Sequence, residues 1–512
     1  MKFSNKSKSV SAIYSVVIIL IFSGFNCIAQ TNDNPGEISY SITIDESKMK
    51  LATVEMFFVP KDSIIYMVPG ANQFPKRWAK FVDNIKAINS KGKLITVEEL
   101  PDARWKMHTP SGERITVSYE VTLDHEEYKW GPGIDGIAYA KDWGVFYTGK
   151  ALFIVNGDMM NADTWENIKV NFSIPQNWKV TTSWKVVPDR NNSFVVKSIY
   201  DLVLNMFFVG THQEVSIKRD GFELVFALGG DEIISQKDEF TKLAEGVLDY
   251  YIDLMGGAPK PSPDNKFNKS IVIINPSSST DGEVIGNNIS LLIETDGDEM
   301  SKMIARFMFA HEFFHLWNGK SFRPTDYDCE WFKEGFTNYY TLKALYHVGI
   351  LNEQSYFEIL NDFFYQKYTN DDGVGKLSMT NGPEKHAHWG LIYGGGLFVG
   401  ISQDMIIRNA TNNEKSIDDL MRGLYNKYGG TNDSYTLEEL RNTMSELSGE
   451  EQIDFFDTYI IGTNKLPLAD YLIIAGLDAK IENGNLIVSK KENITLLQQN
   501  MVNGLFGNLD TR

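Results

Sequence analysis

The stretch His311-Glu312-Phe313-Phe314-His315 places two imidazoles and a carboxylate within five positions. If the stretch is helical, four residues advance the chain by about 400°, so both histidines project from one face, one turn apart. Two imidazoles in that arrangement can bind a single zinc ion. Glu312 lies at the edge of the same face, where its carboxylate can accept a proton from a zinc-bound water. The pattern therefore predicts a zinc site with hydrolytic chemistry.

A third ligand for the same ion is expected from Glu334, which stands nineteen positions after His315 at the start of a second predicted helix. The loop between the two helices is long enough to fold the second against the first. Two histidines, one glutamate and a water form an open site, which is typical of catalytic rather than structural zinc. We therefore predict Zn²⁺ as cofactor, with His311, His315 and Glu334 as metal ligands and Glu312 as general base.

The first part of the chain shows the alternation of half-buried strands. Apolar residues occupy every second position over 38–44, 115–123 and 168–174, which is the period of a strand with one buried face. Clusters of turn-forming Gly, Asn and Ser separate such runs. Several short strands with one apolar face each predict a β-sandwich-like domain over 36–218.

Helical spacing replaces this alternation near residue 232. Apolar residues follow a helical period over 233–255, and strands are expected at 270–275 and, at a sheet edge, at 289–294. Helices are expected over 298–318, 330–348, 352–368, 389–410, 416–428 and 436–446. We therefore predict an α+β protein in which the β domain precedes an α/β catalytic domain over 222–465, mostly helical in its C-terminal half. Residues 466–512 are expected to form a short appendage.

The first 29 residues have the outline of a secretory signal peptide. Three lysines between positions 2 and 8 precede an apolar run over 12–25, and small residues, Cys27 and Ala29, stand where a signal peptidase cleaves. Polar interruptions make the run short for a membrane anchor. We expect cleavage after Ala29 and export to the periplasm or the exterior. Lipid attachment at Cys27 is the alternative. The segment 24–26 speaks against it, because it poorly matches the residues that precede a lipid-modified cysteine.

The composition fits an exported enzyme of several domains. Of 512 residues, 43% are hydrophobic and 23% are charged, as in folded proteins. The net charge of −18 disfavours nucleic acid and anionic membranes as partners. No other stretch is apolar for long enough to suggest an integral membrane span in the mature protein. Cys329 would then be the single remaining cysteine, so no intrachain disulfide is expected.

The sequence around these residues resembles a known family. The segments 311–318 (HEFFHLWN), 323–324 (RP) and 331–337 (WFKEGFT) are similar to those of the glycyl aminopeptidase family of gluzincin zinc metallopeptidases, relatives of the aminopeptidase N clan. The similarity extends to 81–121 in the β domain and to 417–429 and 448–462 in the helical part, so it covers about 36–478. It implies a thermolysin-like catalytic domain and hydrolysis of peptide bonds near the N-terminus of a peptide or protein substrate.

The resemblance implies roles for two further residues. Tyr393, which opens the segment 393–396 (YGGG), is similar to a tyrosine that steadies the tetrahedral intermediate in related gluzincins by donating a hydrogen bond. Asn338 lies one helical turn after Glu334, where thermolysin-like sites carry an acidic residue that orients a zinc-ligating histidine. The structural alternatives are a core tyrosine on a helix-packing surface and an ordinary helix-surface amide.

Two features depart from the family. Its relatives bind the free amine of the substrate through a glutamate in a Gly-rich segment, but in 281–288 (DGEVIGNN) Gly286 occupies that position and Glu283 is displaced from it. Glu283 and Gly286 are therefore candidate substrate-binding positions, and dependence on a free N-terminus is expected to be weak. The chain after Gly476 is too short for the PDZ domain with which the family usually ends.

We therefore predict an exported zinc-dependent peptidase, aminopeptidase-like, that hydrolyses peptide bonds by Glu312-assisted attack of zinc-bound water. One alternative is a non-catalytic exported peptide-binding protein that retains the gluzincin fold. Another is a metal-dependent hydrolase of a non-peptide ester or epoxide. The presence of Glu312 favours an enzyme, because a protein that only binds peptides has no need of a general base.

Overall fold

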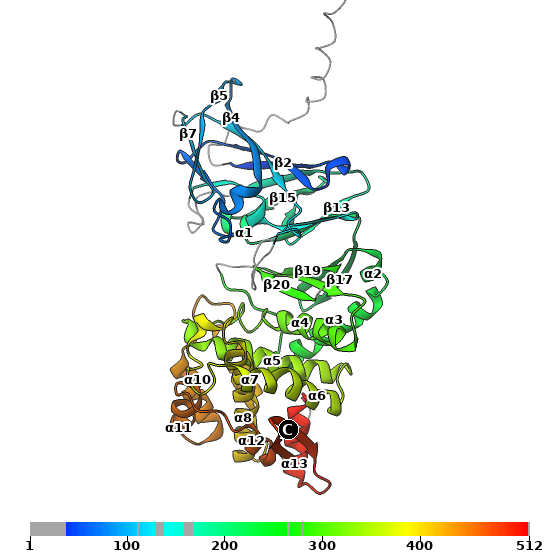
Figure 1. Ribbon diagram of the computed structural model, residues 1–512, viewed down its shortest axis with the longest axis vertical. Coiled ribbons are helices and arrows are strands. Elements are labelled where there is room, and N and C mark those ends of the chain that lie inside the picture. Colours follow the sequence, from blue (N-terminus) through cyan, green and yellow to red (C-terminus); the bar gives the residue numbers. More distant parts are fainter. Residues whose placement is uncertain are drawn as a thin grey trace, which may run out of the picture.

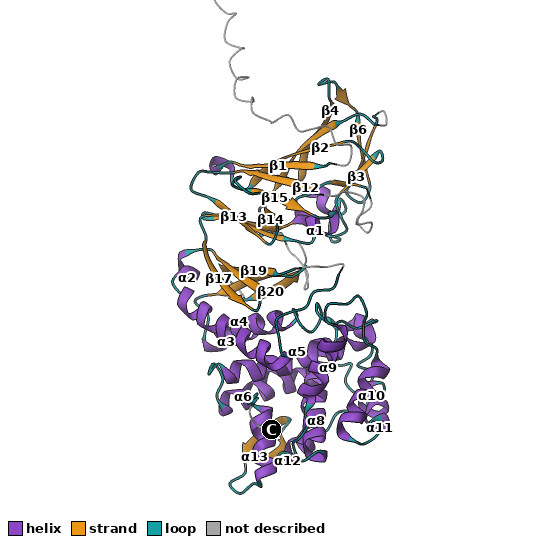
Figure 2. Ribbon diagram, turned by 180° about the vertical axis from the view of Figure 1, so that it is seen from behind, coloured by secondary structure: helices purple, strands orange, loops and turns teal. Residues whose placement is uncertain are grey.

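The computed structural model describes residues 37–109, 112–128, 138–157, 167–263, 267–278 and 280–509. The signal peptide expected over 1–29 lies outside these residues. Three parts follow one another along the molecule: a group of N-terminal sheets, a central five-stranded sheet, and a helical part in which the C-terminal helix lies (Figures 1 and 2). The predicted α+β organisation is confirmed.

The N-terminal part is built on an eight-stranded sheet of order β14-β15-β12-β1-β2-β8-β4-β5, with two four-stranded sheets of orders β13-β16-β10-β9 and β11-β3-β7-β6. Alternate residues of its long strands, such as Val117, Tyr119 and Val121, point into one hydrophobic core. The elements are β1 (Ser39–Ile44), β2 (Leu51–Phe58), β3 (Ile64–Tyr66), β4 (Val82–Asn89), β5 (Leu94–Ile95), β6 (Val97–Leu100), β7 (Arg104–Met107), β8 (Ile115–Thr122), β9 (Tyr139–Lys141), β10 (Gly144–Thr148), β11 (Val155–Asn156), β12 (Ile168–Ser173), β13 (Lys179–Thr182), β14 (Lys185–Val186), β15 (Ser193–Val196), α1 (Ile199–Val203) and β16 (Met206–Gly210).

The central sheet has the order β17-β18-β19-β21-β20, in which β18, β19 and β21 are parallel and both edge strands are antiparallel. Its strands are β17 (Gln213–Arg219), β18 (Phe222–Leu228), β19 (Lys269–Ser277), β21 (Asn288–Glu294) and β20 (Asp281–Ile285). The edge position expected of 289–294 was wrong, because the short hairpin strand β20 pairs along its open side. Since β17 belongs to this sheet, the β domain ends before Gln213.

Both faces of the central sheet are buried, which explains the unbroken apolar run Ile271-Val272-Ile273-Ile274 in β19. Val272 and Ile274 belong to the core shared with the helices. Ile271 and Ile273 face the N-terminal part, where they share a smaller cluster with Phe208 of β16. A strand alternates its side chains between two faces, so β19 holds the sheet to both neighbours at once.

The helical part packs α3 (Lys237–Met255) and α4 (Glu299–Phe314) against the sheet and α5 (Glu330–His347) against α4 (Figure 1). Most of the helices lie within a few residues of their predicted ranges. Besides α2 (Asp231–Ile234), the remaining helices are α6 (Glu353–Ile359), α7 (Gln366–Asn370), α8 (Gly395–Ala410), α9 (Ile417–Tyr428), α10 (Leu437–Ser448), α11 (Ile453–Phe455), α12 (Leu468–Ile474) and α13 (Leu496–Leu505). Single π-helical segments flank four of them. Leu360–Tyr365 lies between α6 and α7, Gly390–Gly394 precedes α8, and Phe456–Ile460 follows α11.

The stretch expected to be an appendage packs into the helical part. Met501, Val502 and Leu505 of α13 belong to the same hydrophobic core as α3, α4 and α5, and the hairpin of β22 (Leu477–Glu482) and β23 (Asn485–Lys490) lies against α12 and α6. Beneath α13, four charged side chains are almost fully buried, namely Lys343, Asp404, Arg408 and Asp418. Arg408 Nε lies 2.9 Å from Asp404, and Lys343 Nζ lies 3.0 Å from Asp418.

One helical stretch, Gly390–Ala410, is long and apolar enough to cross a membrane by length and composition. In the part of the chain that the structure describes, 89% of its most apolar window is buried among other elements. Such burial is typical of a core helix in a folded domain.

Candidate active site

Helix α4 carries the two histidines and is held from both ends. At its start the Asp298 side chain accepts a hydrogen bond from the Ser301 backbone N–H, at 2.9 Å, which satisfies one of the free donors of the first turn. Near its end the Tyr251 hydroxyl donates to the Ala310 carbonyl, at 3.0 Å. The helix ends at Phe314, so His311 lies in its last turn and His315 at its C-cap.

Helix α5 brings Glu334 against the histidines. Asn318, just after α4, donates its amide to the Lys333 carbonyl at 3.0 Å and to the Thr337 hydroxyl at 3.2 Å. This fully buried side chain links the two helices at the level of the site. On its other side α5 touches α8, because Gly335 and Gly396 let the two backbones meet.

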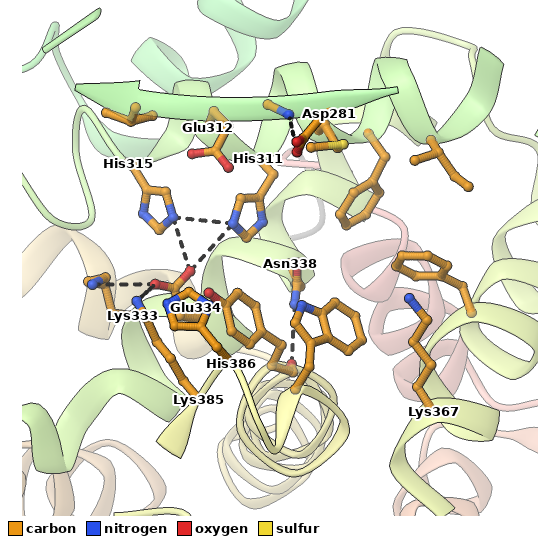
Figure 3. A pocket seen from close by; sticks show the side chains of 18 of the residues that line it. Asp281, His311, Glu312, His315, Lys333, Glu334, Asn338, Lys367, Lys385 and His386 are labelled. Carbon is orange, nitrogen blue, oxygen red and sulfur yellow. Dashed lines mark hydrogen bonds and ion pairs between the residues drawn. The ribbon is translucent and has the colours of Figure 1, made fainter. Parts of the chain in front are cut away.

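The ligand atoms of the three predicted metal ligands converge (Figure 3). His311 Nε2 lies 3.2 Å from His315 Nε2, and Glu334 Oε2 lies 3.5 Å from the first nitrogen and 3.2 Å from the second. Zinc bonds of 2.0–2.1 Å at tetrahedral angles would set ligand atoms about 3.3 Å apart. The three residues therefore fit a zinc ion in both donor type and spacing.

The second nitrogen of each ring determines which nitrogen is free for a metal. His315 Nδ1 lies 2.9 Å from the Asn318 carbonyl, so Nδ1 carries the proton and Nε2 keeps its lone pair. His311 Nδ1 is buried and has no hydrogen-bond partner among the described residues. The tautomer of His315 is thus set by the backbone of its own helix end.

Two lysines hold the Glu334 carboxylate ionised. Its Oε1 lies 2.8 Å from Lys385 Nζ and 3.3 Å from Lys333 Nζ, and both lysines also contact buried Glu330, at 2.7 and 2.8 Å. Burial works against the charge, but His315 and Lys333 outweigh it and hold the pKa of Glu334 well below its usual range. An ionised carboxylate is the form that binds a cation.

Glu312 lines the same cavity beside the three ligands. Burial raises the pKa of its carboxyl group, and the neighbouring His311 offsets part of that rise. A carboxylate with a raised pKa is a stronger proton acceptor than an exposed one, which suits a general base. Figure 3 shows its carboxylate near the histidine rings but away from the point where the ligand atoms meet.

Tyr393 lies across the cavity from α4, in the π-helical segment Gly390–Gly394. Its ring stacks on Trp389 with centroids 5.2 Å apart, and it lies 6.4 Å from the ring of His311. Burial, followed by the charge of Glu334, raises the pKa of its hydroxyl far above the usual range. The hydroxyl therefore stays protonated and can donate a hydrogen bond toward the cavity.

Comparisons with known proteins identify the family. Residues 39–205 match the peptidase M61 N-terminal domain, and residues 305–389 match M61 glycyl aminopeptidase. Both matched segments are those of the M61 glycyl aminopeptidase family. The resemblance stated from the sequence is thereby confirmed, and the matches support a peptidase.

Two solved structures are similar to this chain. An aminopeptidase N family protein from Idiomarina loihiensis is 19% identical, with a TM-score of 0.72 over 87% of this chain and 79% of that one. A variant of the M1 zinc metallopeptidase from Deinococcus radiodurans is 11% identical, with a TM-score of 0.49 over 85% of this chain and 96% of that one. No curated protein matches the sequence.

The remaining predicted site residues lie at different places. Asn338 lines the cavity, but its amide donates to the Tyr393 carbonyl at 3.2 Å, while the carbonyl of Asn318 takes the orienting role at His315. Gly286 lies in the turn after β20 with φ +64°, where a Cβ would meet the Leu204 carbonyl oxygen at 2.5 Å. It belongs to the hairpin tip and is not among the lining residues. Glu283 lies in β20, opposite Ser290 of β21.

The cavity has a volume of about 580 Å³. Among the described side chains, three lining residues come from the edge strand β20, namely Asp281, Gly282 and Val284. Four lysines also line it, namely Lys320, Lys333, Lys367 and Lys385. Burial and the charge of Lys333 lower the pKa of Lys320 to about 8. Sequence reasoning missed Asp281 and the lysines, because no spacing rule links them to the zinc motif.

A second group of donor atoms, from Asp371, Asp372 and His388, lies at the start of the Tyr393 segment. Asp371 accepts from His388 Nδ1 at 2.9 Å and from the backbone N–H groups of Gly373 at 2.9 Å and Leu391 at 3.0 Å. These bonds occupy both oxygens of the Asp371 carboxylate. The group therefore anchors the segment that carries Tyr393.

Proposed function

We propose that the protein is an exported zinc peptidase whose metal is held by His311, His315 and Glu334, with Glu312 as general base. The observation that carries the proposal is that three ligand atoms lie 3.2–3.5 Å apart. The Glu312 carboxylate lines the same cavity and is not one of these ligands. Membership of the peptidase family supports peptides as the substrate class. The N-terminal 29 residues support export through their signal-peptide pattern.

Each residue of the site has a defined task in this proposal. Zinc, when bound, acts as a Lewis acid that polarises the scissile carbonyl and acidifies water. Glu312 accepts the proton of the attacking water and returns it to the leaving amine nitrogen. The Tyr393 hydroxyl donates a hydrogen bond to the carbonyl oxygen as negative charge develops there. Water adds to the carbonyl carbon, the C–N bond breaks, and a free acid and a free amine leave.

The test compares metal content and turnover in matched variants. We expect about one zinc per chain and hydrolysis of a mixed peptide library. In Glu312→Gln, zinc should stay while kcat falls by about a thousandfold, because the amide cannot accept a proton. Glu299→Gln, on the exposed first turn of the same helix, is the control and should keep its activity.

The double variant His311→Ala, His315→Ala should lose the zinc, because Glu334 alone holds the ion far more weakly than three ligands do. Full zinc content in that variant would refute the site. Zinc binding in the native chain without hydrolysis of any peptide would refute the enzyme and favour a peptide-binding protein. N-terminal sequencing of the exported chain should begin at Gln30, and a mature chain that keeps residues 1–29 would refute the export proposal.

A further inference from the structure

We propose that this cavity selects peptides that carry a carboxylate on one side of the scissile bond and an apolar side chain on the other, with Lys320 binding the carboxylate. The inference rests on the proposed peptidase function and names the substrate class of that site.

The charge of the cavity differs from that of the protein as a whole. The chain has a net charge of −18, yet among the described side chains four lysines and three acids line the cavity. The acids are Asp281, Glu312 and Glu334, of which the last two are assigned to the reaction. A bound zinc ion adds two further positive charges. A concave site with an excess of positive charge attracts anions and repels cations.

Among the described residues, Lys320 and Lys367 are the two lining lysines without an ion pair, and the charge of Glu312 acts on Lys320 only from beyond ion-pair distance. Lys333 and Lys385 are held by Glu330 and Glu334. In the described part of the chain Lys320 makes no ion pair and no side-chain hydrogen bond, although it is half-buried. A partly desolvated cation without a partner is costly. A ligand carboxylate would supply the missing partner.

The position of Lys320 relative to the metal ligands is set by the end of α4. Its backbone N–H donates to the His315 carbonyl at 3.1 Å. Gly319, the residue between, has φ +139° and lies beside both His315 and the Lys333 side chain. Lys320 therefore belongs to the end of the cavity where Lys333 and Lys385 lie, and an anion there would be close to the reacting carbonyl.

The other end of the cavity is apolar. It is lined by methionine, isoleucine and phenylalanine side chains from α4 and from the segment after α6, among them Met300, Met303, Ile304, Phe307, Met308 and Phe363. Lys367 at this end lies over aromatic faces, with Nζ 3.9 Å from the Phe363 centroid and 4.5 Å from the Trp389 centroid. Figure 3 shows Lys367 on the opposite side of the histidine pair from Lys333 and Lys385. A peptide across the site thus meets an apolar surface around Lys367 on one side and Lys320 on the other.

The experiment measures kcat/KM for matched peptides. A series carries Glu, Gln or Lys at each position flanking the scissile bond, with Leu on the other side. A second series compares peptides with a free C-terminal carboxylate to the same peptides with an amidated C-terminus. It shows whether the preferred carboxylate is that of a side chain or that of the C-terminus. At one flanking position we expect the carboxylate peptide to exceed its amide partner by about tenfold or more, and Lys to be the poorest.

Variants of Lys320 assign that preference. In Lys320→Met, kcat/KM for the Glu peptide should be about equal to that for the Gln peptide. In Lys320→Glu, kcat/KM for the Lys peptide should exceed that for the Glu peptide. Lys242→Glu, at an exposed position of α3, changes the net charge equally and should leave the ratios unchanged. Calorimetric titration of Glu312→Gln with the same peptides, which it should not cleave, measures binding alone and should show the same loss on adding Lys320→Met.

The outcomes separate this inference from the proposed function. Hydrolysis without a carboxylate preference, or a preference that survives in Lys320→Met, would overturn the inference and leave the peptidase intact. Absence of hydrolysis for every peptide would overturn the proposed function. The titration would then decide the inference alone, since equal affinities for Glu and Gln peptides would overturn it and tenfold tighter binding of Glu peptides would support it.

Discussion

The close crossing of α5 and α8 gives a prediction that links the packing of two helices to the metal site. A Cβ added to Gly335 would lie 2.2 Å from the Gly396 carbonyl carbon and 2.3 Å from its Cα. Added to Gly396, it would lie 2.0 Å from the Trp331 carbonyl oxygen. Because both obstacles are backbone, Gly335→Ala must push the two helices apart by about 1 Å.

The size of the effect follows from two opposing terms. Overpacking costs about 1–3 kcal/mol, and the rigid neighbours place this site at the upper end. Alanine regains up to about 1 kcal/mol of helix propensity over glycine. We expect a net loss of about 2 kcal/mol in the free energy of unfolding. Glu334 is adjacent on α5 and Tyr393 lies just before α8, so a shift of about 1 Å should lower kcat/KM by about a hundredfold.

The assay combines urea denaturation with zinc content and steady-state kinetics on Gly335→Ala. The control is Gly423→Ala on α9, an exposed helical position where a Cβ meets nothing within 4 Å. The control should gain up to about 1 kcal/mol of stability and keep its activity. A Gly335→Ala protein as stable and active as the control would show that the helices do not depend on this contact.

Three further predictions concern the tyrosine, the substrate amine and pH. Tyr393→Phe should keep its zinc and lower kcat by about a hundredfold, with KM little changed; normal kcat would remove the tyrosine from the reaction. Acetylation of a substrate's N-terminus should lower kcat/KM by less than about tenfold, since Gly286 offers no carboxylate; complete loss of cleavage would mean that another acid anchors the amine. Burial lowers the pKa of His125 to about 4, so below pH 6.5 the unfolded chain binds a proton that the native one does not. Between pH 6.5 and 4 the native chain should therefore lose about 3 kcal/mol more stability in urea denaturation than a His125→Gln variant does, and equal losses would contradict this.

The features that depend on periodicity could be predicted from the sequence. The alternation in 115–123 corresponds to β8, and the helical range 298–318 corresponds to α4, apart from its last turn. The predicted last turn is not helical, because Gly319 and the buried Asn318 redirect the chain, a tertiary effect that local spacing does not reveal. Likewise, the run 271–274 indicates a buried strand, but which neighbour each face contacts depends on the whole fold.

In the site, too, residues that follow a local spacing rule could be predicted, and residues defined by tertiary contacts could not. His311, Glu312 and His315 follow from a spacing rule, and Glu334 from the length of a loop. Lys320 carries no such pattern, because its importance arises from the ion pairs that its neighbours make with other residues. The edge strand was misplaced for a related reason, since a five-residue strand such as β20 is too short for its alternation to be recognised.

The buried charges beneath α13 have a consequence for the order in which the protein can mature. The Tyr356 hydroxyl donates to the Leu505 carbonyl, a contact between residues 149 positions apart, and the backbone of Gly504 lies directly on the Arg408 guanidinium. Until residues near 500 emerge from the ribosome, Arg408 and its partners remain open to water and the core of the catalytic domain is incomplete. The catalytic domain should therefore complete its fold only after α13 has been synthesised.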